Sequence, residues 1–313
     1  MPRTVLLGAS GFIGRHVLEL LKDMAGHDVL CLGRSRPPGR TRWLRHDLSA
    51  SDPAALASAL EHFAPSAVVN CAGRTTGSVA ELLEANVAWV ATLLSALEHF
   101  APAARFVQLG SAAEYGEAQP GAPIGEDHRP QPQSAYGASK LAASQLLVQA
   151  QAEGRADVVI LRVFNPVGAG LPVSSVLGRA AAELRRVTAR GNGPLVMGPL
   201  EAYRDFVAVH DVARAVVAAL PEQPRGPLRT PVVRPQSLSP EERIFNIGRG
   251  EAVQVRSLVR ELAALASFAG EIEERALGSP RSERVSWQAA HVERARRIFG
   301  WTPTVPLSVA LET

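Results

Sequence analysis

A tyrosine and a lysine four residues apart, Tyr136 and Lys140, form the most informative pair of side chains in the sequence. On a helix this spacing places both side chains on one face. A lysine charge beside a phenol favours the phenolate and lowers the pKa of the tyrosine from about 10 toward neutral pH. Such a tyrosine can exchange a proton with a carbonyl or alcohol oxygen. The pair therefore indicates acid–base chemistry, with a structural ion pair or a core tyrosine as the alternative.

Upstream of this pair, a strand-like segment at 106–111 ends in Ser111. A hydroxyl at the carboxyl edge of a sheet can donate a hydrogen bond to the same carbonyl oxygen that Tyr136 protonates. A single serine would not indicate catalysis, and Ser111 is a candidate only because Tyr136 and Lys140 accompany it. Together, Ser111, Tyr136 and Lys140 are the candidate catalytic residues.

A glycine-rich segment at 8–14 follows the first apolar run and leads into a helix-like stretch. Glycines let the backbone approach a pyrophosphate, and a helix N-terminus offers free N–H groups and the positive end of its dipole. The position of the segment between strand and helix is the one that a dinucleotide site requires. The candidate cofactor-binding residues here are Gly8, Ser10, Gly11, Phe12, Ile13 and Gly14.

The end of the second predicted strand carries Gly33, Arg34, Ser35 and Arg36. An NAD site usually has an acidic residue there for the ribose 2′-hydroxyl, whereas an arginine accommodates the 2′-phosphate of NADP. Two arginines without a carboxylate favour NADP(H), with Arg34 as the leading phosphate partner and Arg36 as the second. NAD(H) remains open, because both arginines could be solvated surface residues.

Alternating strand and helix patterns place these residues on an α/β scaffold. Apolar runs predict strands at 4–7, 29–32, 67–70, 105–109 and 158–163, and helical spacing predicts helices at 12–22, 54–63, 78–100 and 135–153. This alternation predicts a Rossmann-like, doubly wound parallel sheet with helices on both faces. A helix is also expected at 174–190, and 54–63 has Ser51 or Asp52 as its N-cap.

The chain divides into two predicted parts. Residues 1–163 form the cofactor-binding domain, onto which 208–220 and 244–250 fold back. Residues 164–313 form mainly a smaller C-terminal α/β substrate-binding cap. This part includes a loop at 221–240 that is rich in proline and arginine.

The composition is that of an ordinary globular chain of 313 residues, 46% hydrophobic, with a net charge of +3. This charge gives no basic stripe for nucleic acid. Cys31 and Cys71 have neither metal-ligand nor disulfide spacing, which indicates a reducing cytoplasm and no metal site. Neither a signal peptide nor a membrane-spanning stretch is expected at the N-terminus.

The order of the glycine motif, Ser111 and the Tyr136–Lys140 pair resembles the extended short-chain dehydrogenases/reductases of the NAD-dependent epimerase/dehydratase type. These enzymes include sugar-nucleotide epimerases, dehydratases and reductases. The segment 200–206 is most similar to reductases of GDP-4-keto-6-deoxymannose and related deoxysugar 4-ketoreductases. The other segments that carry the resemblance are 110–116, 162–168, 209–212, 245–248 and 300–301.

The resemblance implies further site residues. Tyr136 and Lys140 would also contact the cofactor, Lys140 through the nicotinamide ribose. Other implied cofactor contacts are Asp47, Leu48, Cys71, Ala72, Gly73 and Phe164. The implied residues for a nucleotide-diphosphate sugar are Ser111, Ala112, Asn165, Arg204 and Arg281, the two arginines holding the diphosphate. The chain departs from the family in its long loop at 221–240 and in having Pro280-Arg281 where an Arg-Pro pair is usual.

The residues after Ser111 bear on the choice of reaction. Sugar 4,6-dehydratases of the family carry an acid and a base in the next two positions, and here both are alanines, Ala112 and Ala113. Glu114 lies one place further on and should face differently by strand alternation.

Arg34 favours net ketoreduction with NADPH from solution. The alternatives are a 4-epimerase with bound NAD, a reductase of a non-sugar ketone, and a non-catalytic nucleotide-binding regulator. The resemblance also implies a cytoplasmic homodimer, formed through the helix that carries Tyr136 and a helix at 85–100 with Trp89 and Leu93.

Overall fold

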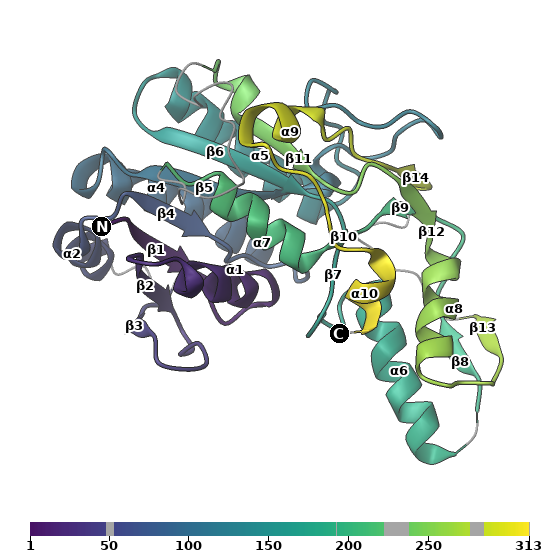
Figure 1. Ribbon diagram of the computed structural model, residues 1–313. Helices are drawn as coiled ribbons and strands as arrows, with labels where there is room; N and C mark the ends of the chain where they lie inside the picture. The colour runs from purple at the N-terminus through teal and green to yellow at the C-terminus, as the bar shows by residue number, and fades with distance from the viewer. Residues whose placement is uncertain (48–52, 192, 222–237, 276–284, 313) are drawn as a thin grey trace.

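The computed structural model describes residues 1–47, 53–191, 193–221, 238–275 and 285–312. At its centre lies a parallel sheet of seven strands (Figure 1). In spatial order the strands are β11 (Ile244–Ile247), β6 (Asp157–Val163), β5 (Arg105–Ser111), β4 (Ala67–Asn70), β1 (Arg3–Leu7), β2 (Asp28–Gly33) and β3 (Arg42–Arg45). The order reverses between β1 and β4, where doubly wound sheets bind ligands at the carboxyl ends of the strands.

Helices cover both faces of this sheet, which explains the continuous apolar runs in its strands. Helices α1 (Phe12–Asp23), α7 (Val209–Ala218) and α9 (Glu293–Phe299) pack on one face. Helices α2 (Pro53–Phe63), α4 (Trp89–Phe100) and α5 (Ala135–Ala152) pack on the other. Val5 and Leu6, adjacent in β1, are both fully buried and belong to the cores on opposite faces. The Rossmann-like α/β fold expected from the sequence is confirmed.

The helix predicted at 78–100 is interrupted. It consists of α3 (Val79–Leu83), a π-helical turn η1 (Glu84–Ala88) and α4, and Ser78 begins it with a capping box to Glu81. The stretch is long and apolar enough to cross a membrane by length and composition. In the fold, α4 packs against the sheet as a core helix.

Trp89 and Leu93, the residues expected at a dimer contact, are not on the surface of the subunit. Trp89 is 3% exposed and Leu93 is fully buried, both in the core between α4 and the sheet. Apolar side chains that follow the helical repeat face the core of their own subunit. On this stretch the exposed large apolar residues are Val79, Leu83 and Phe100.

The C-terminal part forms a smaller unit with its own core, on the right of Figure 1, which we call the cap. Its helices are α6 (Val176–Arg190), α8 (Val255–Leu265) and α10 (Leu307–Glu312). In one of its sheets β9 (Tyr203–Asp205) lies between β12 (Ala252–Gln254) and β14 (Trp287–Gln288), and in the other β13 (Ile272–Glu274) pairs with β8 (Leu195–Met197). The pair β10 (Val207–Ala208) and β7 (Pro166–Val167) connects it to the sheet domain.

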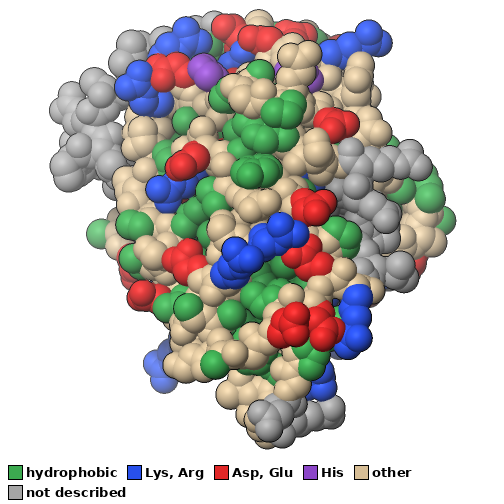
Figure 2. Space-filling view, turned by 90° about the vertical axis from the view of Figure 1, so that its right-hand side faces the viewer, with side chains coloured by type: hydrophobic (Ala, Val, Ile, Leu, Met, Phe, Trp, Pro, Cys, Tyr) green, Lys and Arg blue, Asp and Glu red, His purple; other side chains and the backbone are tan. Residues whose placement is uncertain are grey.

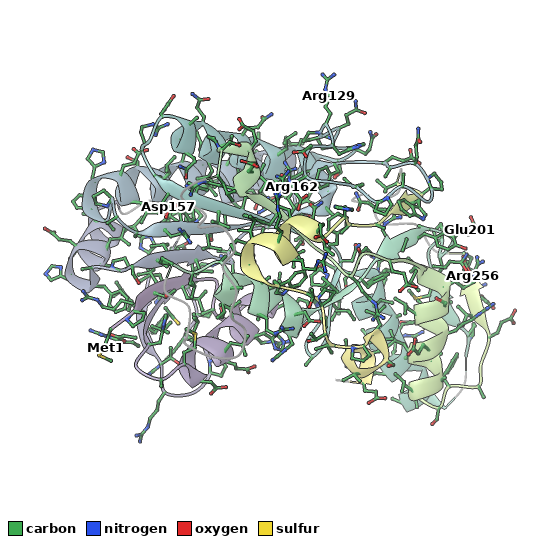
Figure 3. The ribbon with its side chains drawn as sticks, turned by 45° about the horizontal axis from the view of Figure 1, so that its top comes forward. Met1, Arg129, Asp157, Arg162, Glu201 and Arg256 are labelled. Carbon is green, nitrogen blue, oxygen red and sulfur yellow. The ribbon has the colours of Figure 1, made fainter. Side chains whose placement is uncertain are left out.

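The surface at the cap end carries basic and acidic side chains close together, among apolar ones (Figure 2). Arg256 of α8 is an example, since it forms ion pairs with Glu274 of β13 at 2.6 Å and with Glu201 at 3.8 Å. Glu201 and Arg256 lie together at the right edge of Figure 3. Most of the predicted loop at 221–240, residues 222–237, and the proposed helix caps Ser51 and Asp52 lie outside the described residues.

Candidate active site

A cleft of about 740 Å³ lies between the carboxyl end of the sheet and the cap. The sheet side supplies the glycine loop, the end of β5 and the start of α5, and the cap side supplies α6 and the segment around β8 and β9. The predicted site residues that line it are Gly11, Phe12, Ile13, Cys71, Gly73, Ser111, Ala112, Tyr136, Asn165 and Arg204.

The glycine loop at 8–14 is folded tightly enough to exclude side chains. The Gly11 N–H donates to the Gly8 carbonyl oxygen at 2.9 Å, and a Cβ on Gly14 would lie 2.1 Å from that same oxygen. Gly8 itself has φ of +75°, in the left-handed region that favours glycine. Gly11 caps α1 without a side-chain hydrogen bond, so the first N–H groups of the helix are available to an anion. The loop therefore fits a pyrophosphate.

The end of β4 packs against this loop. A Cβ on Gly8 would lie 2.7 Å from the Ala72 nitrogen, and Asn70 accepts a hydrogen bond from that nitrogen at 3.0 Å. Cys71 and Gly73 line the cleft beside it. Burial raises the pKa of the Cys71 thiol to about 12. The thiol is therefore an uncharged wall of the site.

The residues predicted to select the cofactor follow β2 and β3, the last two strands at one edge of the sheet. Arg34 and Arg36 are exposed just beyond β2, and within the described chain neither forms an ion pair. Asp47 is exposed beyond β3, and Leu48 lies outside the described residues. Phe164 is fully buried against Tyr115, so the structure does not bring its side chain to the cleft with the other predicted cofactor residues.

Ser111 and Tyr136 line the same cleft from two adjacent elements. Ser111 is the last residue of β5, and its Oγ accepts a hydrogen bond from the Ala113 N–H at 3.2 Å. An oxygen that accepts from the backbone keeps its own hydrogen free to donate. Tyr136 lies in the first turn of α5, which Ser134 caps. The arrangement suits two donors to one substrate oxygen.

Gly137 explains how closely these elements approach. A Cβ at this position would lie 2.3 Å from the carbonyl oxygen of Ala113. A glycine directly after Tyr136 therefore lets the start of α5 contact the turn that follows Ser111.

Lys140 lies one turn after Tyr136 but is buried behind the cleft wall. Its Nζ donates to the Leu109 carbonyl oxygen at 2.6 Å. Burial lowers the pKa of Lys140, and the charges of Glu114 and Cys71 act in the opposite direction. The expected placement of Lys140 on the Tyr136 face of one helix agrees with the bounds of α5.

Ala112 and Ala113, the two residues after Ser111, both line the cleft. Glu114 does face differently, although the reason is a 3₁₀ turn, η2 (Ala112–Glu114), and not strand alternation. Its side chain is fully buried and pairs with Arg162. Among the described residues that line the cleft, Glu201 is the only carboxylate.

The cleft lining also contains Asn165 and Arg204, the two described residues that were predicted to bind substrate. Asn165 donates to the Asp205 carbonyl oxygen at 2.8 Å, and Arg204 donates to the carbonyl oxygens of Tyr203 and Val285. Burial lowers the pKa of Arg204 to about 10, so the guanidinium stays charged at neutral pH. Arg281 lies outside the described residues.

Two further residues of the site were not predicted from the sequence. Arg179 lines the cleft from the N-terminal part of α6 and forms no ion pair with the described residues. A cation near a helix N-terminus opposes the helix dipole, and this is the signal that could have revealed it. Asn86, in the π-helical turn, accepts from the Arg74 N–H at 2.9 Å and donates to Ser139 Oγ at 3.0 Å, which ties the loop after β4 to α5.

Comparison with known proteins assigns the chain to a family. Residues 4–248 match the NAD dependent epimerase/dehydratase family. The chain belongs to this family. Its members are NAD(P)-dependent nucleotide-sugar oxidoreductases and epimerases, so the protein is an enzyme of that type.

Two curated family members cover nearly the whole chain. A dTDP-6-deoxy-L-talose 4-dehydrogenase (NAD(P)(+)) of Kitasatospora kifunensis is 36% identical over 99% of this chain and 93% of its own. A GDP-6-deoxy-D-mannose reductase of Pseudomonas aeruginosa is 27% identical over 99% of this chain and 94% of its own. The overall identity is thus higher to the talose dehydrogenase than to the reductase that the segment 200–206 resembles.

Solved structures of family members have the same architecture. MoeE5 in complex with UDP-glucose and NAD is 28% identical, with a TM-score of 0.80 over 100% of this chain and 97% of its own. RMD from Pseudomonas aeruginosa complexed with NADPH is 26% identical, with a TM-score of 0.79 over the same shares. The two relatives were therefore solved with different nicotinamide cofactors.

Proposed function

We propose that this protein reduces the 4-keto group of a nucleotide-linked 6-deoxysugar with NADPH, and catalyses the reverse oxidation. The observation that carries the proposal is the pairing of Ser111 and Tyr136 in one cleft next to Ala112 and Ala113. The pair can handle one carbonyl oxygen. The two alanines cannot transfer protons, so the dehydration route of the family lacks its acid and base at these positions.

Each catalytic side chain has a definite role in this proposal. Ser111 donates a hydrogen bond to the keto oxygen, since its own oxygen already accepts from Ala113. Tyr136 gives its proton to the same oxygen as reduction proceeds. Lys140, held by the Leu109 carbonyl, supplies positive charge one helical turn from the phenol. A bound nicotinamide cofactor supplies or accepts the hydride.

The preference for NADP(H) rests on Arg34. It is exposed at the carboxyl end of β2. Residues 33–36 include no acidic side chain of the kind that binds the ribose 2′-hydroxyl of NAD. Arg36 is two residues further along the same loop. Gly11 and the N-terminus of α1 would hold the pyrophosphate. A reductase that draws NADPH from solution gains from a 2′-phosphate site, whereas an epimerase never consumes its cofactor.

The sugar-nucleotide end of the cleft is basic. Arg179 and Arg204 line it from two separate elements of the cap, α6 and β9. Arginine binds the oxygens of a phosphate through paired N–H donors. The two guanidinium groups are therefore our candidates for the diphosphate, and Asn165 for the sugar.

The 6-deoxysugar and the 4-position rest on the relatives. The 36% identical relative is named a 4-dehydrogenase of dTDP-6-deoxy-L-talose, and the 27% identical one a GDP-6-deoxy-D-mannose reductase. Both names describe redox chemistry on a nucleotide-linked 6-deoxysugar. They differ in the nucleotide, which the experiment must identify.

The test combines cofactor binding with turnover. The purified protein is titrated with NADPH and NADH by fluorescence, and a panel of dTDP- and GDP-linked 4-keto-6-deoxysugars is then added while NADPH absorbance is followed. Tighter binding of NADPH and its consumption with one sugar are expected.

The main competing outcome is epimerisation. Two UDP-glucose 4-epimerases are among the relatives that cover 96% of this chain, at 26% and 29% identity. Co-purified NAD with interconversion of sugar isomers and no net cofactor consumption would establish that activity and reject the reductase.

A further inference from the structure

Glu114 is a fully buried carboxylate immediately behind the catalytic serine. One oxygen, Oε1, accepts from the Ser111 N–H at 2.8 Å. The other, Oε2, accepts from Ser144 Oγ at 2.9 Å and from Arg162 Nε at 2.8 Å. Figure 3 shows Arg162, which belongs to β6, near the middle of the molecule. The carboxylate therefore lies in the packed interior, where a charge is costly to place.

The pair formed by Glu114 and Arg162 is a poor device for stability alone. Removing two charges from water carries a large desolvation cost, and well-packed apolar residues often stabilise a core as much or more. The pairing here is also incomplete, since the buried Nη1 of Arg162 has no hydrogen-bond partner in the described part of the chain. A role in the site gives a reason for the pair that stability does not.

The contacts of Glu114 join the two elements that carry the catalytic residues. Ser111 ends β5, and Ser144 lies on α5 one turn beyond Lys140. A single carboxylate thus connects the strand end to the helix. Gly110 leaves the space for it, because a Cβ there would lie 2.7 Å from Glu114 Oε1.

The same turn is also held from the cap. Gln288 of β14 donates to the carbonyl oxygens of Ala112 at 3.0 Å and Gly116 at 2.8 Å. The backbone after Ser111 is therefore fixed by Glu114 on one side and by Gln288 on the other. With this support, small changes in the Glu114 side chain should move Ser111 without unfolding the turn.

The charge of Glu114 also acts on Lys140. The titratable groups whose charges act on Lys140 are Glu114 from η2 and Cys71 from the end of β4, and Tyr136 lies one turn before it on its own helix. Burial lowers the pKa of Lys140, and Glu114 is the largest influence that raises it. Because the Cys71 thiol is protonated at neutral pH, Glu114 is the group that supplies negative charge there.

We propose that Glu114 is a positioning residue for the reaction, which fixes Ser111 relative to the Tyr136 helix and supports the positive charge of Lys140. The proposal rests on the acid–base role of Tyr136 in the proposed function. It assigns to Glu114 no contact with substrate or cofactor.

The experiment compares Glu114→Gln with Glu114→Asp in the full-length enzyme. Gln keeps the length and a carbonyl acceptor but removes the charge, whereas Asp keeps the charge but is shorter. For each variant kcat, KM and the pH profile are measured in the oxidative direction, in which Tyr136 must be deprotonated, on the sugar that the wild type turns over.

The expected results separate charge from position. In Glu114→Gln, Lys140 is less charged and the phenol less acidic, so kcat falls at least about tenfold and the rise of the pH profile moves at least half a unit to higher pH. In Glu114→Asp, kcat falls while the profile stays in place. KM for the sugar changes less than about threefold in both, since neither variant alters the substrate end.

The control is Glu126→Gln, a second buried carboxylate that accepts from the Asn246 N–H at 2.9 Å, outside the cleft lining. It should leave kcat and the pH profile unchanged. An unmoved pH profile in Glu114→Gln, or an equal loss of kcat in Glu126→Gln, would overturn the proposal.

A milder variant covers the case in which Glu114→Gln does not fold. Ser144→Ala removes only the α5 donor to Glu114 and is expected to lower kcat about threefold in a protein that still folds. Wild-type kcat in Ser144→Ala would then reject the positioning role. A wild-type enzyme that epimerises would overturn the proposed function instead, and the same variants would still test Glu114, because epimerisation also needs the Tyr136 proton.

Discussion

At the proposed cofactor end of the cleft the chain presents backbone, and at the proposed substrate end it presents side chains. The glycine loop excludes side chains by contact, with a Cβ on Gly14 lying 2.1 Å from a carbonyl oxygen, and it leaves the N–H groups of α1 exposed. The substrate end instead relies on Arg179 and Arg204, which different cap elements carry. A backbone site can be encoded by a short motif, whereas a side-chain site needs the fold to assemble it.

The largest effect is expected between the two ends, at Tyr136. Tyr136→Phe removes the proton donor and should lower kcat by roughly 10²–10⁴. Because the change removes one oxygen atom, the Kd for NADPH should stay within about threefold. Tyr203→Phe, at the rim of the cap, is the matched control. A variant with wild-type turnover would remove Tyr136 from the mechanism.

At the substrate end, Arg179→Ala should weaken substrate binding alone. Loss of a hydrogen bond to a charged group costs about 1.5–3 kcal/mol, which corresponds to a KM roughly 10–100-fold higher. Steady-state kinetics should show a much smaller change in kcat and none in NADPH affinity. Arg185→Ala, exposed further along α6, is the control. An effect on NADPH binding instead would break the division between the two ends.

At the cofactor end, Arg34→Ala should lower the affinity for NADPH by roughly tenfold and leave that for NADH unchanged, since only NADPH carries the 2′-phosphate. Fluorescence titration of both cofactors measures this. An equal loss for both would mean that Arg34 acts on the shared part of the cofactor. Arg36→Ala, two residues along, tests whether the preference is divided between the two arginines.

The smallest expected effect concerns Cys71, whose side chain lines the cleft beside the glycine loop. Burial raises its pKa from 9.0 to about 12, so at about pH 8 the folded protein holds the unreactive thiol. Because the folded pKa is above the unfolded one, the group stabilises the fold fully below pH 9 and loses this contribution as the pH rises from 9 toward 12. Mass spectrometry after iodoacetamide treatment should show alkylation only in urea; rapid alkylation of the native enzyme would show an open cofactor end.

The sequence was most informative where function depends on short spacing. The Tyr136–Lys140 spacing and the glycine loop are local patterns that the first βαβ unit and a single helix realise directly. Predicting Ser111 required one further assumption, that the carboxyl ends of the parallel strands lie at the same edge of the sheet.

Residues whose roles depend on distant partners were not predicted correctly. Trp89 and Leu93 were assigned to an interface because they are apolar, but the helical repeat turns them to the core. Glu114 was expected to alternate as in a strand, but the chain forms a 3₁₀ turn there. Arg179 lines the cleft only once the cap is folded opposite the end of the sheet, and its one local signal is a positive charge near the N-terminus of a helix.

The path of the chain has a consequence for exchanging parts between relatives. After β6 the backbone enters the cap, returns to the sheet domain as α7 and β11, enters the cap again at β12, and comes back as α9 before ending in α10. A hybrid enzyme made by one crossover would therefore split a hydrophobic core. To transplant the substrate preference of a relative, an engineer would have to graft several separate stretches at once and keep the returning segments native.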